Sequence, residues 1–223
     1  MIKTAILVDG GFYRKRAKAL WGMKTAEERA KELAAYCLAH IQDWNEHVQK
    51  TLYRVFYYDC EPISRKSVYH PLTGKNVDLD KSDTYKWSFQ FLECLKSKRK
   101  FALRMGHISD YMNYNLKPSV TKDLFNGKRT LGSVTENDFV FNATQKGVDM
   151  KIGLDIASLA YKKQVDQIIL IAGDSDFVPA AKLARREGID FILDPMWADI
   201  RSDLFEHIDG LKSQWRKHTN EQQ

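Results

Sequence analysis

The chain has 223 residues, of which 43% are hydrophobic and 12% aromatic, so it can bury a full core and is not disordered as a whole. Its 35 Lys and Arg against 29 Asp and Glu give a net charge of +6 at pH 7, which is compatible with a polyanionic partner. The three cysteines have no C-x-x-C spacing and support neither a disulfide framework nor a zinc knuckle. No apolar run approaches the ~20 residues of a membrane span, so we expect a cytoplasmic protein without a membrane partner.

Short apolar runs alternate with helical patterns along the chain. Strands are expected at residues 4–8, 52–58, 101–105, 168–172 and 191–193, and helices at 26–47, 82–98, 148–163, 177–187 and 200–217. Such an alternation predicts an α/β fold, with an open parallel sheet covered by helices on both faces. We expect one domain over residues 1–223, which ends in a C-terminal helix and a polar tail at 200–223.

Two segments interrupt the alternation. Residues 61–80 contain two prolines and no clear period, which indicates a long surface excursion. Residues 106–147 include "NYNLKPS", "FNGKRTLG" and "DFVFNAT", and we interpret them as a flexible basic loop followed by an edge strand or hairpin. This insertion comes before the fourth parallel strand.

Four aspartates are expected at one edge of the sheet. Asp9 directly follows the first strand, Asp174 and Asp176 follow the fourth, and Asp149 lies in the first turn of the helix that leads into the fourth. The carboxyl ends of parallel strands share an edge, and ligands bind there near the point where strand order reverses. Crowded carboxylates repel one another, and a hard divalent cation such as Mg²⁺ or Mn²⁺ relieves that repulsion.

Each of these features also has a purely structural interpretation. Asp174 and Asp176 are suited to capping a helix after a strand, although the expected convergence with Asp9 and Asp149 favours a functional site. The pair Gly10 and Gly11 is typical of a tight turn. Asp59 and Glu61 follow the second strand, near the same edge; they are either groups that support the site by hydrogen bonding or ordinary loop acids, and we favour the latter.

Three motifs in this order carry a family resemblance: "ILVDGGFY", "KGVDMKIGLDIA" and "IILIAGDSDFVPAAKLARREGIDFIL". Together they resemble the NYN domain of the PIN-like nuclease superfamily, and most of all its bacterial LabA-like branch. The resemblance implies metal-dependent ribonuclease chemistry on a sheet of strand order 3-2-1-4-5. It also implies that Asp9, Asp149, Asp174 and Asp176 are the metal-binding and catalytic acids. One departure is that other branches often carry an Asn shortly after the first Asp, where this chain has Gly10, Gly11 and Phe12.

The chemistry that follows is hydrolysis of a phosphodiester bond in single-stranded RNA by water activated on a divalent ion. Asp155 lies six residues after Asp149 on the same helix, too far to reach the same ion. We expect it to pair with Lys151 one turn back or to support a neighbouring element, with a hydrogen bond to a metal ligand as a further alternative. Candidate RNA contacts are glycines, basic residues, one aromatic residue that can stack on a base and one serine near the acids: Gly10, Gly11, Arg14, Arg16, Lys146, Phe12 and Ser175.

Two other functions share parts of this pattern. A non-catalytic module that binds RNA or protein could retain the acidic metal pocket. A HAD-like phosphatase also uses an Asp after the first strand, but it requires a second Asp two residues later, where this chain has Gly11. The sequence leaves the natural RNA and the oligomeric state open, a homodimer included.

Overall fold

A central mixed sheet organises the fold. The computed structural model describes residues 1–42, 48–64 and 66–215, apart from the side chain of Ser175. Its seven-stranded sheet has the order β6-β5-β2-β1-β7-β8-β9. These strands are β1 (Ile2–Asp9), β2 (Lys50–Cys60), β5 (Phe101–Leu116), β6 (Phe139–Lys146), β7 (Gln167–Ile171), β8 (Asp190–Asp194) and β9 (Gly210–Leu211). Only β6 runs antiparallel to its neighbour in the described sheet, and the five strands expected from the sequence lie in the order β5-β2-β1-β7-β8.

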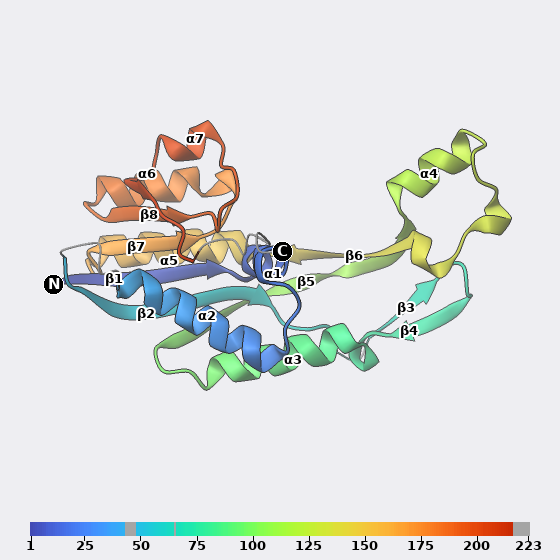
Figure 1. Ribbon diagram of the computed structural model, residues 1–223, viewed down its shortest axis with the longest axis horizontal. Helices are drawn as coiled ribbons and strands as arrows, with labels where there is room; N and C mark the ends of the chain where they lie inside the picture. Colours follow the sequence, from blue (N-terminus) through green and yellow to red (C-terminus); the bar gives the residue numbers. More distant parts are fainter. Residues whose placement is uncertain (43–47, 65, 216–223) are drawn as a thin grey trace, which may run out of the picture.

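Helices cover both faces of this sheet (Figure 1). On one face, α1 (Gly10–Trp21), α2 (Ala26–Ile41) and α3 (Asp83–Lys96) enclose a core that contains Ile6 and Val8. On the other face, α5 (Val148–Tyr161), α6 (Val178–Arg186) and the short α7 (Ser202–Phe205) enclose a core that contains Ala5 and Leu7. Alternate side chains of β1 therefore enter opposite cores, as the pleat of a strand requires. The predicted α/β fold with helices on both faces is confirmed.

The segment expected as a flexible basic loop forms an ordered arm. The first part of β5 pairs with β2, and its continuation from His107 to Leu116 pairs with β6. The helix α4 (Pro118–Phe125) lies between these two strands in the chain, and in Figure 1 the arm extends away from the body. Two of its cations have partners within the arm: Arg129 forms an ion pair with Asp138 at 2.8 Å, and Lys117 donates to the Asn137 carbonyl. The expected loop is therefore wrong for residues 106–125, which form the end of β5 and α4, whereas the expected edge strand or hairpin is present.

Other boundaries also differ from the sequence predictions. The surface excursion contains a hairpin of β3 (Ser67–His70) and β4 (Lys75–Asp78). The helix expected at 26–47 ends at Ile41, and residues 43–47 lie outside the described residues. A continuous helix at 200–217 is wrong: the Asp209 backbone N–H donates to the Phe191 carbonyl of β8, the Asp209 carboxylate accepts from the Phe191 N–H, and the chain continues into β9. The predicted polar tail lies outside the described residues from 216 onward.

Helix α1 was not expected, since Gly10 and Gly11 indicated a tight turn. Its buried residues Tyr13, Ala17 and Leu20 follow a helical spacing, and Asp9 caps its first turn. Gly10 is required by close packing: a Cβ there would lie 2.5 Å from the Tyr57 hydroxyl oxygen and 2.6 Å from the Tyr58 carbonyl oxygen. The glycine therefore lets α1 begin directly against β2, immediately after β1.

Substituting Gly10 tests this packing. Gly10→Ala should lower the free energy of unfolding by about 1–3 kcal/mol, because the added methyl group overpacks against backbone that cannot move freely. The matched change Gly153→Ala, at a position in α5 where a Cβ meets nothing within 4 Å, should raise it by about 0.5–1 kcal/mol. Urea unfolding of both variants decides the matter, and equal effects would contradict the packing described for Gly10.

Candidate active site

Asp9 is the last residue of β1 and the N-cap of α1. Its Oδ1 accepts a hydrogen bond from the Phe12 backbone N–H at 3.1 Å. The pKa of Asp9 is raised from 3.8 to about 6: burial is the largest cause, the negative charges of Asp149 and Asp59 add to it, and backbone hydrogen bonds oppose it. The carboxylate is thus held in a place that is unfavourable for its charged form.

Asp149 lies in the first turn of α5, where the chain returns to the same edge of the sheet. Gly147, at φ 79°, supplies the left-handed turn after β6, and buried Val148 anchors the start of the helix. Asp149 itself is exposed, yet its pKa is raised by partial desolvation and by the charges of Asp174 and Asp176. Asp149 therefore lies within electrostatic range both of Asp9 and of the two acids that follow β7.

Asp174 and Asp176 follow β7 in a loop and a 3₁₀ turn at Ser175–Phe177. The Asp174 carboxylate accepts a hydrogen bond from the Asp176 backbone N–H at 3.1 Å, so it does act as a local cap. That bond uses one of its two oxygens, and both side chains are exposed. Buried Phe177 fixes the turn from below, and the Phe12 ring packs directly against Gly173, so α1 and this loop are in contact.

The four predicted acids thus belong to three segments at the carboxyl edge of β1 and β7, which are paired neighbours from Thr4–Gln167 to Val8–Ile171. Their mutual charge effects place them within electrostatic range of one another. In the described part of the chain, no three His, Cys, Asp or Glu side chains are arranged closely enough to hold an ion among themselves. The arrangement therefore provides carboxylate oxygens without a closed protein cage.

Asp59, at the end of β2, is a buried member of this edge, so the interpretation that we favoured from the sequence, an ordinary loop acid, is wrong. It forms an ion pair with Arg14 of α1 at 2.8 Å and accepts hydrogen bonds from the Tyr57 hydroxyl and from Gln145 of β6. Its side chain is 1% exposed, so it is not a loop acid. Its position at the carboxyl end of a parallel strand was the signal that could have identified it.

The predicted RNA contacts have different environments. Arg14 is engaged by Asp59, and Arg16 donates to the Met196 carbonyl through both Nε and a terminal nitrogen. Phe12 packs inside the fold, whereas Lys146 is exposed at the end of β6. Contacts of RNA with Gly10, Gly11, Phe12, Arg14, Arg16, Lys146 and Ser175 stay predictions, and the side chain of Ser175 lies outside the described residues.

Asp155 lies further along α5 and holds neighbouring strands. It accepts hydrogen bonds from the Tyr58 hydroxyl at 2.8 Å and from Arg104 Nε at 3.0 Å. These partners belong to β2 and β5, respectively. The contacts agree with a supporting role for Asp155 in the packing of α5 against the sheet.

Comparison with known proteins decides the family. The model of the NYN domain matches residues 90–201, a segment that contains Asp149, Asp174 and Asp176 and begins after Asp9. The chain belongs to the NYN domain family. NYN domains are part of the PIN-like nuclease superfamily, so nucleic acid hydrolysis is the kind of activity to which this membership points.

A crystal structure of a protein of unknown function from Vibrio parahaemolyticus RIMD 2210633 is similar over 94% of this chain and 91% of that chain, with 16% sequence identity and a TM-score of 0.48. No curated protein matches the sequence. In the residues that the structure describes, no helix is both long and apolar enough to cross a membrane.

The raised pKa of Asp9 predicts a pH-dependent effect on stability in metal-free protein. Asp9→Asn keeps a capping oxygen and removes the charge, so above pH 6 it should raise the free energy of unfolding by about 1–3 kcal/mol. The cost of the ionised Asp9 is fully present above its folded pKa of about 6 and disappears below 3.8, where both states are protonated. The advantage of the variant should therefore shrink as the pH falls through this window.

Urea titrations of wild type and variant in EDTA, at about pH 7 and about pH 4, measure this difference. A stability difference that is the same at both pH values would contradict the electrostatic account of Asp9.

Proposed function

We propose that this NYN protein is a metal-dependent ribonuclease that hydrolyses phosphodiester bonds of single-stranded RNA. The observation that carries the proposal is the concentration of negative charge at the carboxyl edge, where Asp9 and Asp149 both have raised pKa values, in part because neighbouring aspartates repel them. A structural role does not require several acids from separate segments to repel one another at one edge. Membership of a nuclease superfamily supports hydrolysis of a phosphodiester as the use of this charge.

The residues present fit a divalent cation. Their donors are carboxylate oxygens, which Mg²⁺ and Mn²⁺ prefer. A nearby cation would also stabilise the charged form of Asp9 and so lower its raised pKa. Mg²⁺ commonly keeps several waters and uses one or two protein carboxylates together with substrate phosphate oxygens. An open arrangement of acids is compatible with that mode of binding, in which the substrate completes the site.

Within this proposal, Asp9 and Asp174 are the direct ligands, and Asp149 and Asp176 act through water or orient the attacking water. The bound ion supplies a polarised phosphate and a water of lowered pKa. The elements supply the positions of these acids: Asp9 ends β1, Asp174 follows the neighbouring strand β7, and Asp149 begins α5. Lys146 is exposed and precedes Asp149 by three residues, so its positive charge can attract the RNA backbone near the acids.

Two aspartates of α5 separate catalysis from structure. Asp149→Asn should abolish Mn²⁺-dependent cleavage of a labelled single-stranded RNA while the protein keeps or slightly gains stability, because one repelling charge is removed. Asp155→Asn should retain substantial activity and lose about 1 kcal/mol of stability, because it weakens the bonds with Tyr58 and Arg104. Cleavage rates and melting curves for both variants are the measurement.

The outcomes are distinct. Equal loss of activity in two well-folded variants would contradict the roles given to Asp149 and Asp155. A wild type that binds RNA but does not cleave it with Mn²⁺ or Mg²⁺ would favour the non-catalytic binding module.

A further inference from the structure

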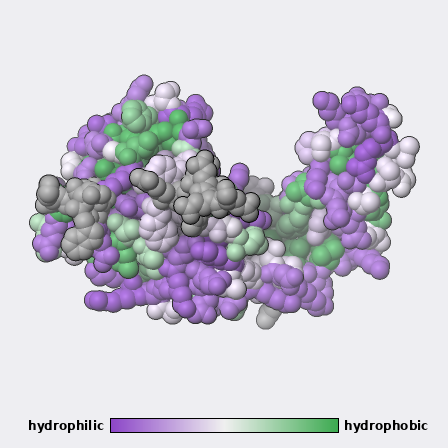
Figure 2. Space-filling view, in the orientation of Figure 1, coloured by the Kyte–Doolittle hydropathy of each residue, from purple (hydrophilic) through white to green (hydrophobic). Residues whose placement is uncertain are grey.

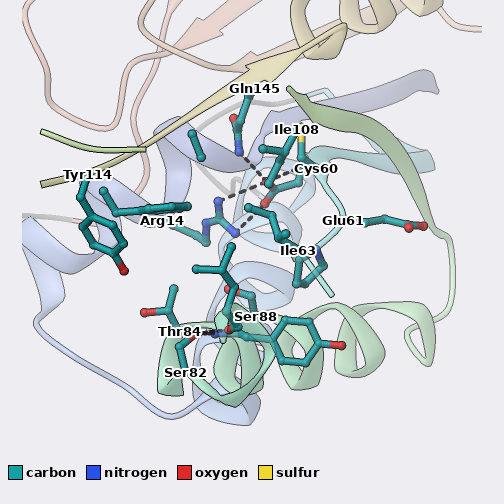
Figure 3. A pocket seen from close by; sticks show the side chains of 16 residues that line it. Arg14, Cys60, Glu61, Ile63, Ser82, Thr84, Ser88, Ile108, Tyr114 and Gln145 are labelled. Atoms are coloured by element: carbon teal, nitrogen blue, oxygen red, sulfur yellow. Dashed lines mark hydrogen bonds and ion pairs between the residues drawn. The ribbon is translucent and has the colours of Figure 1, made fainter. Parts of the chain in front are cut away.

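A cavity of about 370 Å³ lies where the arm leaves the body. One wall is formed by the start of α3 and the residues after β2, and the opposite wall by the facing strands β5 and β6 (Figure 3). Its size is in the range of small-molecule sites, roughly 300–1,000 Å³. In Figure 1, β1 runs from the N-terminus toward the arm, so the carboxyl edge of the sheet lies on the same side as this cavity. Figure 2 shows the surface hollowed between body and arm.

The polar end of the cavity adjoins the candidate active site. Arg14 and Gln145 reach the Asp59 carboxylate from two sides, at 2.8 and 3.2 Å, and all three residues line the cavity (Figure 3). A Cβ on Gly11 would lie 3.4 Å from Asp9 Oδ1 and 3.5 Å from Gln145 Oε1, so these two oxygens flank the same glycine. A molecule that occupies the cavity therefore lies next to Asp9, which in the proposed function is a ligand of the catalytic cation.

Aromatic rings line the cavity beyond this polar end. Tyr114 of β5 and Phe141 of β6 have ring centroids 5.3 Å apart, and Tyr85 of α3 contributes a third ring. Hydroxyl groups of Ser88 and Thr84 lie on the α3 side. The lining thus combines flat apolar surfaces with an amide and hydroxyls that can donate and accept hydrogen bonds. This combination suits a flat heteroaromatic molecule with a polar edge.

We propose that this cavity binds the base of a nucleotide that flanks the scissile phosphate of the RNA. The proposal rests on the proposed ribonuclease function and adds a site that positions the substrate. Stacking on an aromatic ring contributes about 1–3 kcal/mol per base without demanding a sequence, and Gln145 and Ser88 offer groups for the polar edge of the base. The base enters beside Arg14 and Gln145, and its phosphate then lies toward Asp9.

Crosslinking locates the base without requiring turnover. A short single-stranded oligouridine that contains 4-thiouridine is irradiated with the wild-type protein in EDTA, and the crosslinked peptides are identified by mass spectrometry. We expect crosslinks in peptides that contain Tyr85, Tyr114 or Phe141. Ser88→Trp fills the cavity from α3 and leaves the arm untouched, so it should remove these crosslinks and weaken binding of the same RNA fivefold or more.

Phe125→Ala is the matched control, because it removes an aromatic ring that is 88% exposed on α4, outside the cavity. It should crosslink and bind as the wild type does. Crosslinks confined to other peptides, or binding that Ser88→Trp leaves unchanged in a folded protein, would overturn the base site while cleavage by the wild type still stands. Absence of RNA binding would overturn the base site too, and the separate Mn²⁺-dependent cleavage assay then decides whether the proposed function fails with it.

Discussion

The ion pair between Asp59 and Arg14 determines how the carboxyl edge of the sheet is organised. Asp59 is buried at the end of β2, and removing either partner of such a pair leaves an uncompensated charge inside the protein. The pair joins α1 to β2, and Gln145 extends it to β6 at the base of the arm. Asp59 also adds to the raised pKa of Asp9, after burial and the charge of Asp149.

Two close contacts maintain that geometry. Gly10 lets α1 begin against Tyr57 and Tyr58, and Gly173 receives the ring of Phe12, so α1 is fixed both to β2 and to the loop that carries Asp174. Close-packed interiors have few voids and transmit small displacements, so a shift at either contact would move α1 and the acids beside it. The acids are therefore positioned by backbone and ring contacts, among them the hydrogen bonds from Phe12 and Asp176 N–H groups that Asp9 and Asp174 each accept on one oxygen.

The sequence predicted the buried strands and the edge at which the acids gather, because a fully apolar run such as that of β7 has few alternatives. Helix α1 was missed because its two starting glycines have a low helix propensity, which the packing of Gly10 overrides. The position of Asp59 at the end of a strand is visible in the sequence, but its partners Arg14 and Gln145 are distant in sequence, and no local pattern predicts these contacts. The arm depends likewise on long-range pairing between β5 and β6.

The central claim is that the carboxylates at this edge form a divalent cation site. Calorimetric titration of the purified protein with Mn²⁺ tests it most directly. The account predicts saturable binding by the wild type, weakened by roughly tenfold or more in Asp9→Asn and in Asp174→Asn and little changed in Asp155→Asn, since each lost ligand contact is worth at least ~1.4 kcal/mol. Unsaturable or undetectable binding by the wild type, or equal affinity in Asp9→Asn, would contradict it.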